Sequence, residues 1–362
     1  MTRCGGGAAG TTDGYTQFLE SVYSASVRPL PLNVMTLYAD LAQRLALQDT
    51  RPGSISSKKV DGRKYLYAVE KDGRARTQRF LGPAISSVAQ ADAGRIRRAA
   101  ELAKELRNTV TLLKNAHVPG PSLALGRILE VVANAGLFQR GVTLVGTAAY
   151  QTYACVVGSH LAAANLTTND VDLSLSEFIA GDREEGIQAI LKRADATFEP
   201  VLHADDRLPK VFMAANGFTV DFVTRRRRGR RSPVPVASLG VSAVALSFQE
   251  LPVEDTMESV ALYGSGVLVR VPSPLKFAVH KLIVAQQRRQ AQTAKKQKDL
   301  SQAQELIDIY LETDEGALLD ALDDARERGR AWKSAINASL REIGREPGQG
   351  RLPVATSSRK RT

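Results

Sequence analysis

Residues 169–175 read Asn169-Asp170-Val171-Asp172-Leu173-Ser174-Leu175 and place two aspartates one residue apart in a largely apolar run. Side chains alternate between the two faces of a β-strand, so both aspartates would share one face while Val171, Leu173 and Leu175 face a core. Two carboxylates this close repel each other, and burial would raise their pKa values unless a cation lay between them. The pattern therefore predicts a site for a hard cation such as Mg²⁺, which commonly binds one or two carboxylates together with substrate phosphates.

Two further segments fit around this strand. Upstream, the apolar run Gly141-Val142-Thr143-Leu144-Val145 ends in Gly146-Thr147, and the pattern predicts a helix over Ala148 to Leu161. Gly146 would let the backbone approach a triphosphate, Thr147 would add a hydroxyl, and the amides at the start of the helix would favour an anion. Downstream, residues 217–223 predict a second alternating strand with an inward acid, Asp221.

A strand, Gly-Thr, a helix, a strand with Asp-x-Asp and a later strand with a third aspartate together resemble the polymerase-β-like nucleotidyltransferase superfamily, over roughly Ser122 to Val223. The resemblance implies an α+β fold with a mixed sheet flanked by helices. It also implies an NTP substrate, phosphate-binding roles for Gly146 and Thr147, and two Mg²⁺ ions, with Mn²⁺ as an alternative, on Asp170, Asp172 and Asp221. Asp221 would then serve as general base.

The chain departs from the superfamily pattern at two points. Thr147 stands where serine or glycine is usual, which keeps a hydroxyl. The interval Ala148–Asn169 is also longer than usual. A longer helix, or an extra loop between Gly158 and Thr168, would absorb the difference.

A later segment resembles the helical C-terminal half of divergent bacterial nucleotidyltransferase-fold proteins, some of them abortive-infection or toxin–antitoxin enzymes. It comprises residues 274–282, with Arg288-Arg289 and Lys298-Asp299-Leu300 after it. The resemblance implies that Lys281 pairs with phosphate oxygens as a point charge. The alternative is an ordinary helix lysine that extends its charge to solvent.

The N-terminal region contains a predicted β-hairpin over residues 58–83, with strands 58–70 and 74–81 around Lys71-Asp72-Gly73. Its mixture of aromatic and basic residues suits nucleic acid, and it resembles arm-type DNA-binding modules of recombinases. The alternative is a sheet that only packs on the catalytic domain. The predicted nucleic-acid-binding residues are Lys58, Lys59, Tyr65, Tyr67, Arg225, Arg226, Arg227 and Arg228.

These patterns divide the chain into five parts. We expect a disordered tail at 1–14, helices with the hairpin and a linking helix at 15–121, a nucleotidyltransferase core at 122–271, a helical domain at 272–345 and a disordered basic tail at 346–362.

The composition and the spacing of residues exclude several classes of protein and of site. The two cysteines, Cys4 and Cys155, cannot build a disulfide framework, and the four scattered histidines do not have zinc-ligand spacing. No apolar stretch approaches a membrane span and the N-terminus lacks a secretory apolar segment, so we expect a cytoplasmic protein without membrane contact. A net charge of +11 and several basic runs favour a polyanionic partner, RNA or DNA.

The leading hypothesis is a Mg²⁺-dependent enzyme that moves a nucleoside monophosphate from an NTP to an acceptor hydroxyl and releases pyrophosphate. An RNA end is the favoured acceptor, and a protein or a small molecule are the alternatives. A rival hypothesis is a non-catalytic nucleic-acid-binding protein that has kept the fold. A third is a toxin of the same chemistry that a cognate partner protein restrains.

Overall fold

The computed structural model describes residues 27–162, 166, 168–175, 185–202, 207–226, 232–248 and 251–345. Both predicted tails, at 1–14 and 346–362, lie outside these ranges, as does the rest of the basic run after Arg226.

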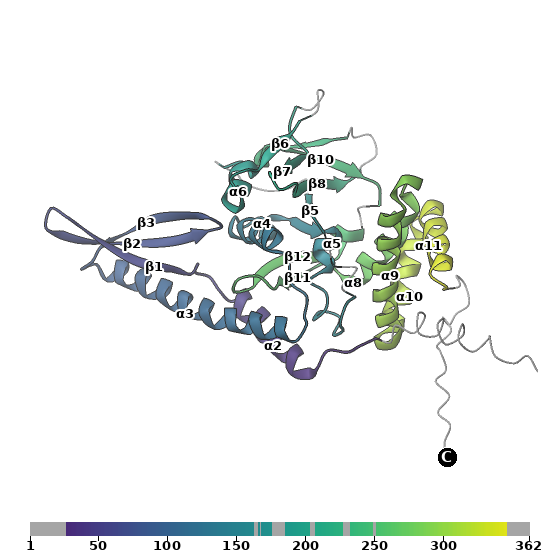
Figure 1. The fold of residues 1–362 in the computed structure, drawn as a ribbon, viewed down its shortest axis with the longest axis horizontal. Coiled ribbons are helices and arrows are strands. Elements are labelled where there is room, and N and C mark those ends of the chain that lie inside the picture. Colours follow the sequence, from purple (N-terminus) through teal and green to yellow (C-terminus); the bar gives the residue numbers. More distant parts are fainter. Residues whose placement is uncertain are drawn as a thin grey trace, which may run out of the picture.

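A mixed seven-stranded sheet forms the centre of the molecule (Figure 1). Its main path runs β4-β5-β8-β10-β9, and β6 and β7 extend it beside β8. β5, β8 and β10 run parallel, whereas β4, β7 and β9 run antiparallel to their neighbours. The strands are β4 (Val142–Val145), β5 (Asp170–Leu175), β6 (Glu199–Val201), β7 (Val211–Met213), β8 (Thr219–Arg225), β9 (Val234–Val236) and β10 (Val241–Leu246).

Alternation in β5 and β8 separates a buried apolar face from an acidic face. Val171, Leu173, Val220 and Phe222 are all buried, while the aspartates between them stay partly exposed. Because the period of a strand is two residues, this pattern fixes which side of the sheet carries the acids. The predicted strands at 141–145, 169–175 and 217–223 are therefore confirmed, and in the last two the acids lie on one face of the sheet, as predicted.

Helices pack around the sheet. α4 (Leu123–Asn134) begins after Ser122, whose side chain accepts a hydrogen bond from the backbone N–H of Leu125 and so caps the helix. α6 (Ile187–Ala194) packs against α4. α7 (Leu251–Glu254) and the β11–β12 hairpin (Thr256–Ala261 and Val267–Pro272) lead to the C-terminal helices.

Four C-terminal helices pack together on one side of the sheet (Figure 1). They are α8 (Pro274–Gln287), α9 (Thr293–Thr313), α10 (Glu315–Glu327) and α11 (Arg330–Glu342). Pro274 stands in the first turn of α8, where its missing N–H costs nothing. The predicted helical tail is confirmed.

The N-terminal region contains α2 (Leu32–Ala46), three strands and a long helix, α3 (Ser87–Asn115). The strands are β1 (Gly53–Val60), β2 (Arg63–Asp72) and β3 (Ala75–Pro83), and we call this sheet the arm. The predicted single strand over 58–70 is wrong, because Asp61 and Gly62 both take positive φ and form a two-residue turn between β1 and β2. Asp-Gly is a favoured pair for such turns.

The predicted helix over Ala148 to Leu161 is also wrong. α5 spans only Gly146–Tyr150 and is followed by turns. β-branched and aromatic residues such as Thr152, Val156 and Val157 form helices poorly, and Tyr153 is held instead by a 2.8 Å hydrogen bond to the carbonyl of Pro272. The described residues between Gly158 and Thr168 lie in neither helix nor strand, which rules out a longer helix over them.

One continuous hydrophobic core joins α2, α3, the sheet and the C-terminal helices. The predicted domain boundaries at residues 121 and 271 therefore remain a proposal, because the parts on either side of each boundary share this core. Among the described residues, no helix has the length and apolar character needed to cross a bilayer.

Candidate active site

The three predicted acids lie on the same face of two neighbouring strands. Parallel pairing of β5 with β8 places Asp172 directly beside Asp221, and Asp170 beside Thr219. Side chains of paired residues point to the same side of a sheet. Asp170 also accepts a hydrogen bond from the hydroxyl of Thr168.

Gly146 forms the corner beneath this acidic face. β4 pairs antiparallel with β5 so that Val145 faces Asp172, and the next residue, Gly146, turns away with φ +67°. A Cβ at this position would overlap the carboxylate oxygen Oδ2 of Asp172. Glycine is therefore required at position 146 for two reasons: the backbone is left-handed there, and the carboxylate of Asp172 packs over it.

Burial and like charges act together on the acids. Burial, and then the neighbouring charges of Asp170 and Asp221, raise the pKa of Asp172 to about 7. The pKa of Asp221 is also raised, first by burial and then by Asp170, although a hydrogen bond from Thr219 opposes the shift. Carboxylates that cannot all ionise at neutral pH form a site where a cation would be favoured.

A buried ion pair forms the opposite wall. The ammonium of Lys281 in α8 lies 2.6 Å from Oδ1 of Asp299 in α9, and the Nε of Arg288 lies 2.8 Å from Oδ2 of the same carboxylate. Burial opposes ionisation of Asp299, but these two cations outweigh it and hold the pKa below its usual value. Lys281 lines the cleft, as expected for a phosphate ligand, but its charge is already shared with Asp299.

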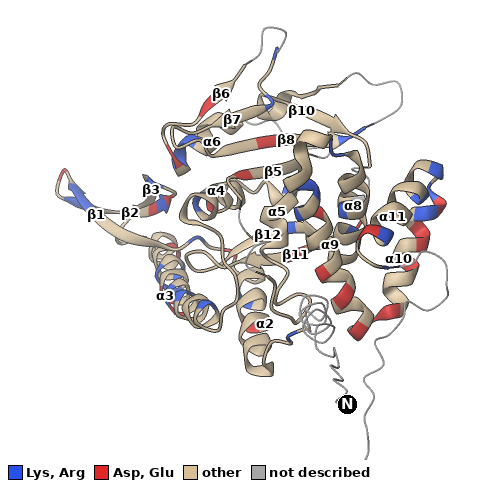
Figure 2. Cartoon of the chain, turned by 45° about the vertical axis from the view of Figure 1, so that its right-hand side comes forward, with Lys and Arg blue, Asp and Glu red and all other residues tan. Residues whose placement is uncertain are grey.

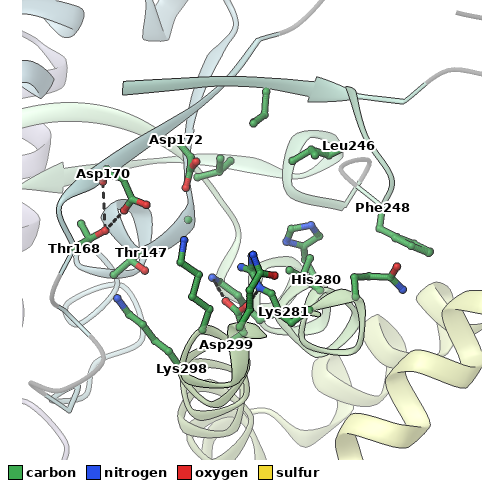
Figure 3. Close-up of a pocket in the computed structure, with 18 of the residues that line it drawn as sticks. Thr147, Thr168, Asp170, Asp172, Leu246, Phe248, His280, Lys281, Lys298 and Asp299 are labelled. Atoms are coloured by element: carbon green, nitrogen blue, oxygen red, sulfur yellow. Dashed lines mark hydrogen bonds and ion pairs between the residues drawn. The ribbon is translucent and has the colours of Figure 1, made fainter. Parts of the chain in front are cut away.

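Further lysines come from α9. Lys295 and Lys298 line the cleft with Lys281, and Lys281 and Lys295 both act to lower the pKa of Asp172. Burial, and then the charge of Lys281, lower the pKa of Lys298, while Asp170 and Asp299 oppose that shift. Figure 3 shows the aspartates on the strand side of the cleft, facing Lys298, Lys281 and Asp299 from the helices.

The cleft between these walls is large enough for a nucleotide. Its volume is about 1110 Å³, and Gly146, Thr147, Asp170 and Asp172 line it. Leu246 and Phe248 add an apolar part, and Arg226, Arg288 and Arg289 add further positive charge. His280 is in the wall, where burial lowers its pKa to about 3 and keeps the ring neutral.

The other predicted site residues fall into three groups. Asp221 lies beside Asp172 in the sheet but is not among the residues that line the cleft. Arg225 and Arg226 end β8 and follow it, with Arg226 at the cleft, while Arg227 and Arg228 lie outside the described residues. Lys58, Lys59, Tyr65 and Tyr67 belong to the arm and do not line this cleft.

Metal binding is constrained by the same geometry. Within the described part of the chain, no group of three His, Cys, Asp or Glu side chains stands ready to hold a metal ion. Two carboxylates, Asp170 and Asp172, do line the cleft, and Mg²⁺ commonly takes one or two carboxylates and completes its shell with phosphate oxygens and water. The donor set therefore fits an ion that arrives with a nucleotide.

Two elements of the site were not predicted to belong to it, although Lys298 lies in a segment that carries the resemblance. Lys295 and Lys298 are three residues apart in α9, a spacing that places both on one helix face, and this signal was available in the basic run 288–298. Thr168 precedes Asp170 in a loop and gave no comparable signal.

A mixed sheet flanked by helices, with paired aspartates on one strand beside a glycine corner, fits a nucleotidyltransferase fold. Consistent with this, the sequence profile of a family described as nucleotidyltransferase matches residues 124–327. The chain belongs to this nucleotidyltransferase family, whose general chemistry is transfer of a nucleoside monophosphate. No curated protein matches the chain, and no solved structure does.

Proposed function

We propose that this protein binds an NTP with a divalent cation in the cleft and transfers the nucleoside monophosphate to an acceptor hydroxyl, with release of pyrophosphate. The observation that carries this proposal is the placement of Asp170 and Asp172 over Gly146, opposite the lysines of α8 and α9. Negative groups on one wall and positive groups on the other suit a metal–triphosphate complex, which carries both signs.

The acids would hold the cation. Asp170 and Asp172 would supply its carboxylate ligands, and the negative charge of Asp172 would become fully developed only when the ion is present, since its pKa is about 7 without one. Mg²⁺, or Mn²⁺ in its place, would polarise the phosphate and stabilise charge on the attacking and leaving oxygens. Asp221, the neighbour of Asp172 with a raised pKa, is our candidate for a third ligand or for the general base that takes the acceptor's proton.

The phosphates would lie against the glycine corner and the lysines. The absence of a side chain at Gly146 leaves room for the backbone to approach an anion, and Thr147 lines the cleft next to it. Lys298 and Lys295 would bind phosphate oxygens directly. Lys281 would do so together with its partner Asp299, which fixes the position of its ammonium.

The acceptor would reach the cleft past Arg226, Arg288 and Arg289. Guanidinium groups bind phosphodiesters well, so an RNA end is the favoured acceptor, and a protein hydroxyl or a small molecule are the alternatives. A cognate partner protein that restrains the activity would fit the resemblance to toxin-like enzymes.

The direct test is transfer of label. The purified protein is incubated with total RNA, total protein or a metabolite extract and, separately, with labelled ATP, GTP, CTP or UTP, in Mg²⁺ or Mn²⁺. We expect metal-dependent transfer to one acceptor class by the wild type and none by the double variant Asp170→Ala/Asp172→Ala. The matched control is Asp320→Ala, which removes an exposed acid from α10 and should leave transfer unchanged. Label transfer that survives the double variant would place the chemistry elsewhere.

The second candidate is a non-catalytic nucleic-acid-binding protein, and the exposed basic residues of the arm favour it. Thermal unfolding distinguishes the two. Stabilisation by NTP that requires Mg²⁺ supports the enzyme, because a ligand stabilises only the state that binds it. Absence of any metal-dependent NTP effect supports the binding protein.

A further inference from the structure

One face of the arm combines exposed aromatic rings with positive charge. Alternation and register place the side chains of Lys58, Arg63, Tyr65, Tyr67, Arg76, Gln78 and Phe80 on the same side of the sheet. We call this set the outer face. The opposite face carries Ala68, which is fully buried, and packs against α3.

The aromatic residues of the outer face form a cluster in contact with solvent. The rings of Tyr65 and Tyr67 lie 5.9 Å and 5.5 Å from the ring of Phe80, between centroids. Phe80 keeps 56% of its surface exposed, and both tyrosines are partly exposed. An exposed aromatic cluster is costly in water, which argues that it binds another molecule.

The charge around the cluster selects the partner. Lys58 lies 5.0 Å from the centre of the Tyr67 ring and 2.8 Å from Gln78, and Arg63 and Arg76 are exposed at the two turns. Within β1–β3, all of which the structure describes, the acids of the strands point to the other face: Glu70 pairs with Arg79, and Asp72 pairs with Arg193. Lys71, near the base of the arm, is left out of the set because its charge acts on Glu130 of α4, where it opposes the rise that burial causes in the pKa of that acid.

The arm packs on α3 through the face opposite the outer face and is joined to the rest of the molecule at its base. The backbone N–H of Arg74 donates to the carbonyl of Arg193 in α6 at 2.7 Å, and Asn134 donates to Asp72 at 2.9 Å. Its far end extends beyond the rest of the molecule (Figure 1), and Figure 2 shows Lys and Arg residues along it. A long ligand could therefore lie along the outer face without meeting the core.

We propose that the outer face of the arm binds single-stranded nucleic acid, with unpaired bases stacked on Phe80 and the tyrosines and phosphates on Lys58, Arg63 and Arg76. Every base has a π-face, so aromatic platforms bind single strands with little sequence preference. Paired bases in a duplex do not offer that face, and the exposed rings thus favour a single strand. This surface is separate from the cleft and does not depend on its chemistry.

The test is binding of labelled oligonucleotides by fluorescence anisotropy, with single-stranded RNA, single-stranded DNA and a duplex of the same sequence. The full-length protein carries Asp170→Ala/Asp172→Ala, so that binding is read without transfer. We expect single strands to bind more tightly than the duplex. The affinities for single-stranded RNA and single-stranded DNA then show which of the two nucleic acids binds more tightly.

Variants of the outer face separate stacking from charge. Phe80→Ala should weaken single-strand binding by about fivefold or more, and Phe80→Trp should restore it. Lys58→Gln/Arg76→Gln should lower the slope of log affinity against log salt by about 1.4, measured between about 50 mM and about 200 mM salt. The matched control is Lys64→Gln/Arg97→Gln, which removes an exposed lysine of β2 on the opposite face and an exposed arginine of α3.

Three results would overturn the proposal. They are tighter binding of duplex than of single strands, equal losses from the outer-face and control pairs, and unchanged affinity in Phe80→Ala with an unchanged thermal unfolding midpoint. Because Phe80 is exposed, its loss should leave the fold intact, and the unfolding midpoint checks this. Failure of this proposal leaves the nucleotidyl-transfer proposal standing, since no step of the binding assay uses the cleft.

Discussion

Asp172 and Asp221 are direct partners across the parallel strands β5 and β8, so two carboxylates stand side by side on one face of the sheet. Strands normally avoid like charges at paired positions, because such pairs are destabilising. The cost is tolerated here beside a glycine corner and opposite a basic wall. The repulsion between these two carboxylates is explained if a cation binds between them during function.

The first prediction is that Asp172→Asn stabilises the protein without metal while it abolishes transfer. The folded-state pKa of Asp172, about 7, lies above the value of an unfolded aspartate. Its contribution to stability is therefore fully present below about pH 4 and is lost as the pH rises through about 7. Asparagine does not titrate, so at about pH 8 in EDTA the variant should exceed the wild type by on the order of 2 kcal/mol in the free energy of unfolding, after allowance for solvent contact.

Urea unfolding of both proteins at about pH 8 and about pH 4 gives this comparison. The difference should be small at the acidic pH and large at the basic pH. A variant less stable than the wild type at about pH 8 would show that Asp172 makes a favourable contact when ionised, against our interpretation.

The second prediction concerns Gly146 and uses Gly136 as its control. Both glycines have φ +67°, but only at Gly146 would a Cβ meet another group, the carboxylate of Asp172, whereas Gly136 has open space around it. Each alanine variant should lose about 1 kcal/mol of stability through the left-handed backbone. Gly146→Ala should in addition displace Asp172 and lower transfer by about a hundredfold, because active-site geometry tolerates little displacement.

Steady-state transfer and thermal unfolding of the two variants provide the measurement. If Gly136→Ala loses as much activity as Gly146→Ala, backbone strain alone explains the effect and the contact with Asp172 is irrelevant.

The third prediction separates two lysines of the cleft. Lys281 is buried in an ion pair with Asp299, so Lys281→Ala leaves that carboxylate with Arg288 alone and should cost about 3 kcal/mol of stability. Lys298 is less buried, and Lys298→Ala should change stability by less than about 1 kcal/mol while it raises the KM for NTP. Unfolding curves and initial rates on both variants test this. A stable Lys281→Ala protein with a raised KM would assign Lys281 mainly to phosphate.

Much of this site follows from local pattern. Strand alternation around Asp170 and Asp172, and again around Asp221, is enough to place the acids on one face, because the period of two residues depends on nothing distant. The Asp61-Gly62 pair is an equally local signal for a turn, although the predicted strand over 58–70 runs across it. The pairing of Lys281 with Asp299 was not predictable, since it depends on how α8 and α9 pack. The short α5 also depends on tertiary contacts, chiefly the burial of Tyr150 and Tyr153 against Phe277.

The fourth prediction is that divalent-ion binding depends on pH in the neutral range. Carboxylates with ordinary pKa values near 4 are fully ionised between about pH 6 and about pH 8 and would give a constant affinity there. Asp172, with a pKa of about 7, must lose its proton to become a ligand. Its ionised fraction falls from about nine-tenths to about one-tenth over that range, so the affinity should weaken by about tenfold as the pH drops.

Mn²⁺ titration of the nucleotide-free protein, followed by the electron paramagnetic resonance signal of the free ion, measures this without interference from phosphate titration. Asp320→Ala, the exposed control on α10, should show the same pH dependence as the wild type, whereas Asp172→Asn should lose most of the binding. A wild-type affinity that stays constant between about pH 6 and about pH 8 would mean that Asp172 is ionised before the ion arrives. In that case the basic wall of α8 and α9, rather than a metal, would be what offsets the repulsion between the acids.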